Sequence, residues 1–193
     1  IETGALILPP GYFISWSGQY IAETEARERL KIAFPIVLFI IILILYFTFE
    51  SKLSLFVVLT ALPISLTGGI ILLYIFSFKM SVAIWMGFIA LFGIATDDGV
   101  VLVNTLDNNC YNFKDKEMLK ELVLNGALLR IRPIIMTTAT TILALIPILF
   151  SQGAGSEIMR PMALPTIGGL FTATLSNTIL VPVIYLWLKE KTL

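Results

Sequence analysis

The sequence of 193 residues has no histidine and a single cysteine, Cys110. These absences exclude a disulfide within the chain and any zinc site built from cysteine and histidine. They also remove the histidine that usually serves as the base in nucleophilic catalysis. We expect Cys110 to be an inert thiol in a loop or at a helix end, and we expect no cofactor.

Charge is scarce as well. Only 13% of the residues are charged, 58% are hydrophobic, the formal net charge is zero and the mean hydropathy is +0.93. Soluble domains carry about 25% charged residues, so this chain has too little polar surface to stay dissolved. Since there is no basic excess, nucleic acid is not an expected partner. The expected surroundings are membrane lipid.

The sequence contains long runs without a charged residue. A helix needs about 20 residues to cross a bilayer. Four such runs are free of charge, and a fifth is interrupted only by two aspartates. The expected spans are about 32–49, 53–78, 81–106, 133–152 and 161–188. Prolines within them are acceptable, because neighbouring helices can satisfy the backbone groups that proline frees. The sequence therefore predicts an all-α integral membrane protein with a five-helix bundle.

Lysine and arginine are concentrated on one side of these spans. That side holds Lys52, Lys114, Lys116, Lys120, Arg130, Arg132, Lys189 and Lys191. The other side holds Lys79 and Arg160, apart from the charges of the N-terminal segment. Positive charge favours the cytoplasm, so we expect the C-terminus and the 107–132 loop to be cytoplasmic.

The ends and loops carry further signals. Residues 1–31 begin without methionine and are expected to be the tail of a larger outer domain, running into a helix from about Tyr20, whereas 32–193 form the membrane domain. Residues 114–133, KDKEMLKELVLNGALLRIRP, place apolar side chains among charges at roughly helical spacing. This favours a short amphipathic helix along the cytoplasmic face that ends where Pro133 opens the fourth span, with a solvated linker as the alternative. Residues 151–165, SQGAGSEIMRPMALP, predict a tight outer hairpin.

Glycine pairs occur in two spans, at Gly68-Gly69 and Gly168-Gly169. Small residues let transmembrane backbones approach closely. We interpret both pairs as sites of tight helix packing rather than as hinges.

Two adjacent aspartates, Asp97 and Asp98, interrupt the third span in the stretch FGIATDDGVVLVN. Asp97 lies ~13 Å below the cytoplasmic surface at ~1.5 Å per residue. A charge at such depth costs at least ~2.5 kcal/mol on insertion scales, so ionisable residues there usually mark ion or proton paths. A purely structural contact between helices is the alternative.

A second polar cluster opens the fourth span, where RPIIMTTATT contains Thr137, Thr138, Thr140 and Thr141. These lie ~6–12 Å deep, which overlaps the level of the aspartates. Hydroxyl groups can bond a carboxylate in either protonation state. We therefore expect a proton relay formed by Asp97, Asp98, Thr137, Thr138 and Thr141.

The surface of the third span suggests which aspartate carries the proton. Steps of three and four from Asp97 reach mostly small or polar residues, namely Ala83, Met86, Ala90, Gly93 and Asn104. The same steps from Asp98 reach Ile84, Leu91, Ile94, Leu102 and Thr105, which are bulkier. Small stripes pack against neighbouring helices. Asp97 is therefore expected to point into the bundle toward Thr137 and Thr141, and Asp98 to matter less.

Catalysis is not expected. Intramembrane aspartyl proteases need two carboxylates that face each other across two helices, and adjacent residues of one helix diverge by ~100°. No other acidic residue lies inside a predicted span, and neither a Ser/His pair nor a cluster of metal ligands is present.

The stretches GFIALFGIATDDGVVLVN, RIRPIIMTTATTILALIPILFSQGAGSEIMRPMALPTIGG and LVPVIY together resemble the C-terminal half of the resistance–nodulation–division (RND) efflux permeases, in their heavy-metal branch. The resemblance covers nearly the whole chain. It implies a twelve-span membrane domain of which these are the last five spans, in a proton antiporter of the bacterial inner membrane that exports metal cations. It also implies a homotrimer that contains the N-terminal half of the same permease and works with a periplasmic adaptor and an outer-membrane channel.

The resemblance implies what residue to expect at three positions of the site. An acidic residue falls at Asp97 in the metal-exporting members, and Met159 matches a methionine thought to help hand metal along. A lysine follows RxRP in those members, whereas this chain has Ile134. Arg130 and Arg132 are poorly placed to replace that buried lysine. Two other interpretations stay open: an RND module that uses proton flow for another task, such as protein translocation, and a structural membrane subunit.

Overall fold

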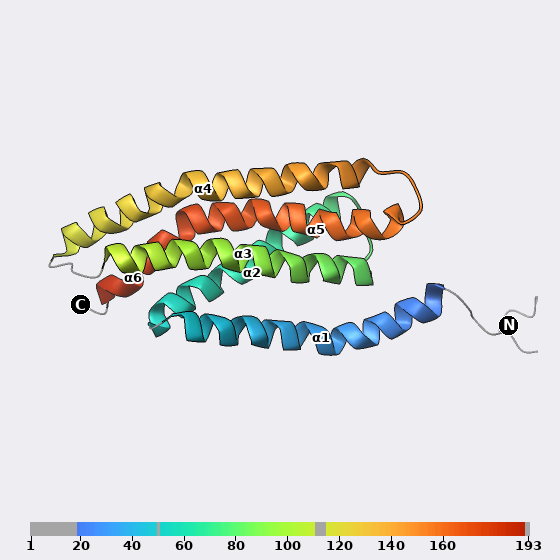
Figure 1. The fold of residues 1–193 in the computed structure, drawn as a ribbon, viewed down its shortest axis with the longest axis horizontal. Coiled ribbons are helices and arrows are strands. Elements are labelled where there is room, and N and C mark those ends of the chain that lie inside the picture. Colours follow the sequence, from blue (N-terminus) through green and yellow to red (C-terminus); the bar gives the residue numbers. More distant parts are fainter. Residues whose placement is uncertain (1–18, 50, 111–114, 192–193) are drawn as a thin grey trace, which may run out of the picture.

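The computed structural model describes residues 19–49, 51–110 and 115–191, and every regular element in these ranges is a helix. In chain order the elements are α1 (Gln19–Thr48), α2 (Lys52–Ile75), α3 (Val82–Asn109), α4 (Lys116–Phe150), α5 (Ser156–Leu175), the π-helical turn η1 (Ser176–Leu180) and α6 (Val181–Lys191). The last three elements form one rod (Figure 1). Within the described ranges, five helices are long and apolar enough to cross a membrane when that rod is counted once. The predicted all-α, five-helix membrane fold is confirmed.

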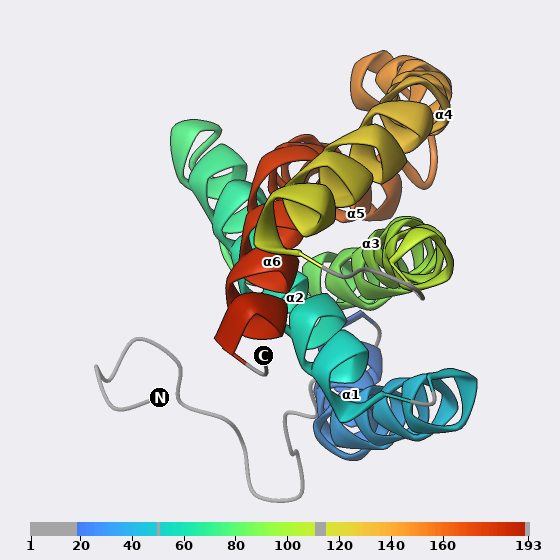
Figure 2. The same cartoon turned by 90° about the vertical axis from the view of Figure 1, so that its left-hand side faces the viewer.

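The helices run back and forth along the long axis of the molecule (Figure 1). We call the end at which α1, α3 and α6 finish the C-terminal end, and the opposite end the N-terminal end. A view along the rods shows α1 and α4 on opposite sides, with α2, α3 and α5 between them (Figure 2). α3, which carries both aspartates, lies between α1 and α4 in this view.

Paired glycines allow α2 and α5 to pack closely. A Cβ added to Gly168 would lie 2.5 Å from the carbonyl oxygen of Gly68, and one added to Gly69 would lie 2.9 Å from that of Pro165. Without side chains at these positions the two backbones can touch, which is how many helices associate in lipid. The prediction that the glycine pairs serve packing is confirmed.

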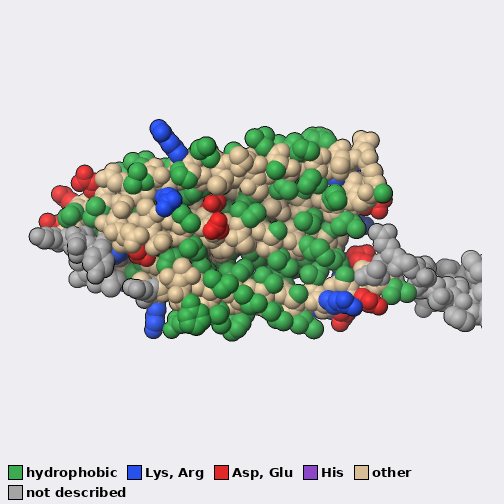
Figure 3. Space-filling view, in the orientation of Figure 1, with side chains coloured by type: hydrophobic (Ala, Val, Ile, Leu, Met, Phe, Trp, Pro, Cys, Tyr) green, Lys and Arg blue, Asp and Glu red, His purple; other side chains and the backbone are tan. Residues whose placement is uncertain are grey.

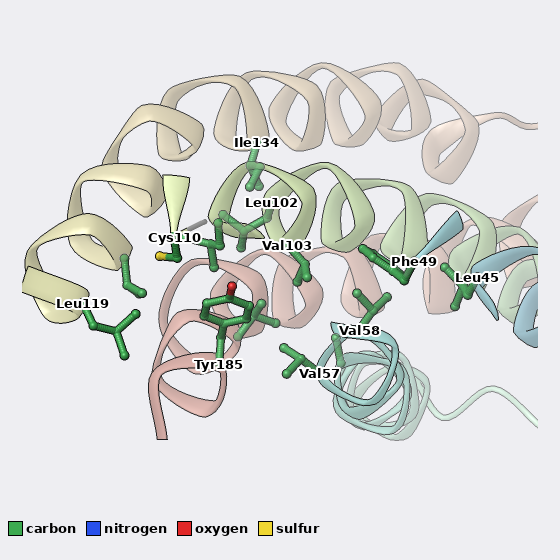
Figure 4. Close-up of a cluster of buried hydrophobic side chains, with 14 residues drawn as sticks. Leu45, Phe49, Val57, Val58, Leu102, Val103, Cys110, Leu119, Ile134 and Tyr185 are labelled. Carbon is green, nitrogen blue, oxygen red and sulfur yellow. The ribbon is translucent and has the colours of Figure 1, made fainter. Parts of the chain in front are cut away.

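Two clusters of buried apolar side chains fill the bundle. One lies toward the C-terminal end and joins α2, α3, α4 and α6 through residues such as Val57, Leu102, Leu119 and Tyr185 (Figure 4). The other surrounds Ile84, Phe88 and Leu91 of α3. In lipid such contacts stabilise mainly through close van der Waals packing. They fix α3 against α2 and α5 on both sides of the aspartates.

α1 stands apart from the other helices. Many of its large side chains are exposed, among them Phe39 and Phe47. Phe34 gives α1 an aromatic contact with α3, since its ring lies 5.2 Å from that of Trp85 and 5.8 Å from that of Phe92. The space-filling view shows a hollow between α1 and the rest of the bundle (Figure 3).

The expected amphipathic helix and the fourth span are a single helix. α4 runs for 35 residues from Lys116 to Phe150, with Pro133 inside it. The expectation of a separate helix ending at Pro133 was therefore wrong. Proline is tolerated within a membrane helix because nearby hydroxyls and neighbouring helices satisfy the freed groups.

The connection between α4 and α5 is the tight hairpin that the sequence predicts, but it is shorter. Only residues 151–155 separate the two helices, and Gly155 has a φ of +94°, which glycine adopts without strain. The remainder of the segment, from Ser156, is already helical. The lead-in helix expected from about Tyr20 is the start of α1, whereas the expected outer-domain tail in residues 1–18 lies outside the described residues.

Candidate functional site

Asp98 faces α4. Its side chain is half-buried, and the hydroxyl of Thr137 lies 3.5 Å from Asp98 Oδ1. The same hydroxyl lies 2.9 Å from the carbonyl oxygen of Ile134. A hydroxyl has one proton to donate, so the long contact with Asp98 competes with the bond inside α4. Thr137 can thus donate to the carboxylate or release it.

Asp97 faces the hollow between α1 and α3. Its exposed side chain lines a groove of about 250 Å³ together with Leu45 and Thr48 of α1 and Thr96 of α3. Both hydroxyls donate to their own helices, Thr48 to Ile44 across 2.8 Å and Thr96 to Phe92 across 2.7 Å. The Asp97 carboxylate is therefore open to groups that enter the groove.

The expected direction of the two aspartates was wrong, since Asp98 and not Asp97 points toward Thr137. The bulky stripe that contains Ile84, Leu91 and Leu102 is the buried one, and these residues are at most 1% exposed. Gly93, on the stripe of small residues, has no atom within 4 Å of a Cβ built there. In this bundle large apolar side chains fill the interior, and the small stripe lines the groove beside α1.

The predicted threonines divide into three roles. Thr137 contacts Asp98, as described. The hydroxyls of Thr138 and Thr174 lie 2.7 Å apart; since Thr174 donates to the carbonyl oxygen of Leu170, Thr138 is the donor between them. Thr141 donates to the carbonyl oxygen of Thr137 within α4. The structure thus brings Thr137 to an aspartate and joins Thr138 to α5, and Thr141 supports the backbone at Thr137.

Position 134 offers no charge to the aspartates. Ile134 is 5% exposed and packs in the apolar cluster with Leu102 and Val103. Arg130 donates from Nε to the hydroxyl of Thr105 across 2.8 Å. Thr105 lies seven residues beyond Asp98, or ~10 Å along the helix. Among the described residues neither aspartate has an ion pair.

Met159 lies in the first turn of α5 at the N-terminal end and is 55% exposed. Met162, one turn further, is also exposed. In the ranges that the structure describes, no group of three or more histidine, cysteine, aspartate or glutamate residues could hold a metal ion. Met159 is accessible, but it does not belong to such a ligand cluster.

A third aspartate, Asp107, forms a polar network that the sequence analysis missed. Ser54 donates to Asp107 Oδ2 across 2.6 Å and Tyr185 donates to Oδ1 across 2.7 Å. Lys189 in turn donates to the Tyr185 hydroxyl across 2.8 Å. Asp107 was excluded because the predicted span ended at residue 106, whereas α3 continues to Asn109. The network joins α2, α3 and α6 near the C-terminal end.

Cys110 follows α3 and is almost fully buried in the same region. Burial raises the pKa of its thiol, although Lys189 nearby opposes that rise. A thiol that stays protonated is a poor nucleophile and a poor metal ligand. The position at a helix end is as predicted, and the inertness of the thiol stays a prediction.

The sequence profile of the AcrB/AcrD/AcrF family matches residues 3–189. The chain belongs to the AcrB/AcrD/AcrF family.

Curated members of the AcrB/AcrD/AcrF family show how this chain relates to whole permeases. It is 39% identical over 194 residues to the cation efflux system protein CusA of Escherichia coli K12, covering 95% of this chain and 18% of that protein. It is 33% identical over 178 residues to the cobalt-zinc-cadmium resistance protein CzcA of Cupriavidus metallidurans, covering 92% and 16%. The chain therefore spans less than a fifth of the length of these curated relatives.

A solved structure of a heavy metal efflux pump in crystal form II has the same fold, with a TM-score of 0.77 and 30% identity over 97% of this chain and 18% of the other. Together with the curated relatives it confirms the resemblance to the heavy-metal RND permeases. In this chain Asp97 is followed by a second carboxylate, Asp98, and the residue after RxRP is the apolar Ile134.

Proposed function

We propose that this chain is the last five spans of a proton-driven permease of the bacterial inner membrane that exports metal cations. The observation that carries the proposal is the pair of carboxylates on α3, in the middle of a span and open to two different helix interfaces. An ionisable residue at that depth is costly to keep, so a transport role explains it better than a single structural bond. The names of the curated relatives support metal cations as the substrate.

Asp97 is the residue that we assign as the proton carrier. Its carboxylate lines the groove beside α1, where water or another part of the permease can reach it. It also stands where metal-exporting members have an acidic residue. Each proton that enters down a 100 mV potential supplies ~2.3 kcal/mol. Loss of the carrier would therefore remove the energy source and leave the substrate site intact.

Asp98 and the threonines complete the relay in this proposal. The hydroxyl of Thr137 can donate either to Asp98 or to the carbonyl oxygen of Ile134 in its own helix. The Asp98 carboxylate therefore has a hydrogen-bond donor in one arrangement and lacks it in the other. Thr138 joins α4 to Thr174 of α5, so movement of one helix is passed to the other. Thr141 holds the backbone turn that positions Thr137.

The substrate path lies mostly outside this chain. Met159, exposed at the N-terminal end, offers a thioether that suits Cu(I) or Ag(I). We assign it a role in handing such ions along. Met159→Leu in the full-length permease should then slow Ag(I) export and leave Zn²⁺ export unchanged.

The remaining proposals concern orientation and partners. The C-terminal end faces the cytoplasm, as the concentration of lysine and arginine there favours. The exposed face of α1 and the open side of Asp97 fit coverage by the N-terminal half of the same permease. A homotrimer with a periplasmic adaptor and an outer-membrane channel follows from the family.

Full-length permease in lipid vesicles tests the proposal. Vesicles with the cytoplasmic side inward are loaded with Ag(I) or Zn²⁺ and a pH dye, and the lumen should acidify as the metal leaves. Vesicles without metal should show no such change. Metal export without acidification would contradict proton antiport, and acidification that does not depend on metal would contradict coupling.

A further inference from the structure

The π-helical turn η1 carries three polar residues in succession, Ser176, Asn177 and Thr178, within an otherwise apolar stretch of the last span. Ser176 is 4% exposed and Asn177 is fully buried. π-turns are rare and are frequently found at functional sites. Neither the predicted relay nor the packing of the rod accounts for this turn.

Each of the three residues has a buried side-chain oxygen without a hydrogen-bond partner in the part of the chain that the structure describes: Ser176 Oγ, Asn177 Oδ1 and Thr178 Oγ1. Several other hydroxyls of the spans donate to a carbonyl three or four residues earlier, as Ser65 does to Leu62 and Thr174 to Leu170. The π-turn displaces the carbonyls from that register. A buried polar group left without a hydrogen bond is unfavourable. A turn with three such groups calls for a partner.

The turn lies beside the aspartates. Asn177 donates from Nδ2 to the carbonyl oxygen of Ala95 across 3.5 Å, and a Cβ built on Gly99 would lie 3.7 Å from Asn177 Oδ1. Ala95 and Gly99 bracket Asp98 on α3. The free amide oxygen is therefore at the level of the carboxylates, on the inner side of α3, whereas Asp97 faces the groove on the other side.

The partner of Asn177 must be small and must already be inside the bundle, whereas Thr178 is only partly buried and lines an apolar groove between α4 and α6. Asn177 is 0% exposed, so spans outside this chain cannot reach it without moving these helices. The three free oxygens are all neutral, which suits water better than a metal ion. Buried water typically makes about three hydrogen bonds to groups that have no other partner.

We propose that the turn at η1 binds ordered water beside Asp98 and that this water forms the inner part of the proton route. The first half stands on the unpartnered buried oxygens alone. The second half rests on the proposed proton-driven function.

Water-edited solid-state NMR on full-length permease in bilayers, with ¹⁵N-labelled asparagine, tests the first half. The side-chain amide of Asn177 is assigned by its loss in Asn177→Leu, or by its shift in Asn177→Gln if the leucine variant does not assemble. Rapid transfer of water magnetisation to that amide is the expected result. Transfer as slow as that of dry core amides would overturn the water site.

Proton uptake in vesicles tests the second half. Asn177→Leu should slow metal-dependent uptake at least tenfold, and the double variant Ser176→Ala, Thr178→Val should slow it severalfold while keeping the amide. Ser65→Ala is the matched control, since its buried hydroxyl is satisfied within α2, and it should transport normally. Uptake at the wild-type rate in both η1 variants would contradict a role in the route.

The two proposals fail separately. If Asp97→Asn and Asp98→Asn both leave proton uptake intact, the proposed function is wrong, and the water transfer to Asn177 still decides whether η1 is hydrated. If those aspartate variants stop uptake and the η1 variants do not, the proton route avoids this turn.

Discussion

At the scale of single residues, Asp107 shows how this bundle holds a carboxylate near the membrane boundary. Both of its oxygens accept a hydrogen bond, one from Ser54 and one from Tyr185, and Lys189 bonds the tyrosine. Asp97 and Asp98 have no such complete set of donors among the described residues. The contrast separates a carboxylate that is fixed in structure from two that are free to change partners.

Tyr185→Phe should destabilise the permease. It removes one donor from Asp107, and a hydrogen bond to a charged group contributes about 1.5–3 kcal/mol. We expect the apparent melting temperature in detergent to fall by several degrees. Tyr74→Phe is the control, because Tyr74 is 85% exposed. Equal melting temperatures for the Tyr185 variant and wild type would show that the network contributes little.

Thr137→Val should slow proton uptake roughly three- to tenfold, since it removes the hydroxyl that faces Asp98 across a long contact worth at most about 1.5 kcal/mol. Thr140→Val is matched to it, because the Thr140 hydroxyl bonds only within α4. Initial rates in vesicles measure both. Slowing of the Thr140 variant alone would refute the assignment of Thr137.

The residues of the candidate site could be identified from the sequence, but their directions could not. An aspartate pair in an apolar run is visible without a structure, as is a run of threonines. The direction of each aspartate side chain depends on which face of α3 packs against the neighbouring helices. The expectation that small residues mark the packed face is wrong for this helix. Asp107 was not predicted because the expected end of the third span was three residues too early. The π-turn was not predicted because it leaves no periodic pattern in the sequence.

At the scale of helices, the runs without charge predicted the five spans well because lipid leaves a helix few alternatives. The continuity of α4 was not predictable from Pro133 alone. A proline stops a helix in water, but within this bundle the chain stays helical on both sides of it. The charges of the first turns of α4 reflect its exposed end and not a separate element.

The contact between α2 and α5 gives a prediction at this scale. Gly168→Ala would place a methyl group 2.5 Å from the Gly68 carbonyl oxygen and 2.8 Å from Leu72 Cβ, so the helices must separate. Overpacking typically costs about 1–3 kcal/mol. We expect a lower melting temperature and less assembled permease on size-exclusion chromatography.

Gly93→Ala provides the comparison within a helix, because nothing lies within 4 Å of the added Cβ. Its melting temperature should equal that of wild type or exceed it slightly, since alanine favours helix over glycine. If both alanine variants behave alike, close approach of the backbones is not what holds α2 to α5.

At the scale of the whole molecule, this bundle has one well-packed side and one open side. α2, α3 and α5 bury their contacts, whereas α1 exposes most of its apolar surface and leaves a hollow at Asp97 (Figure 3). A carboxylate exposed at this depth in a membrane needs contact with other protein groups or with water. The rest of the permease would supply these contacts.

The proposed topology can be tested in a Cys110→Ala background. Gln152→Cys, in the hairpin before α5, should react with a membrane-impermeant maleimide added to intact cells. Lys116→Cys, at the start of α4, should react only after the cells are opened. Labelling of the Lys116 variant in intact cells would overturn the five-span orientation.

We assign proton transport to Asp97. Full-length Asp97→Asn is reconstituted with metal and a pH dye inside the vesicles and is compared with Asp98→Asn and wild type. We predict that Asp97→Asn abolishes metal-dependent acidification while trimer assembly and metal binding persist, and that Asp98→Asn retains part of the activity. Near wild-type acidification by Asp97→Asn, with loss in Asp98→Asn, would contradict the assignment.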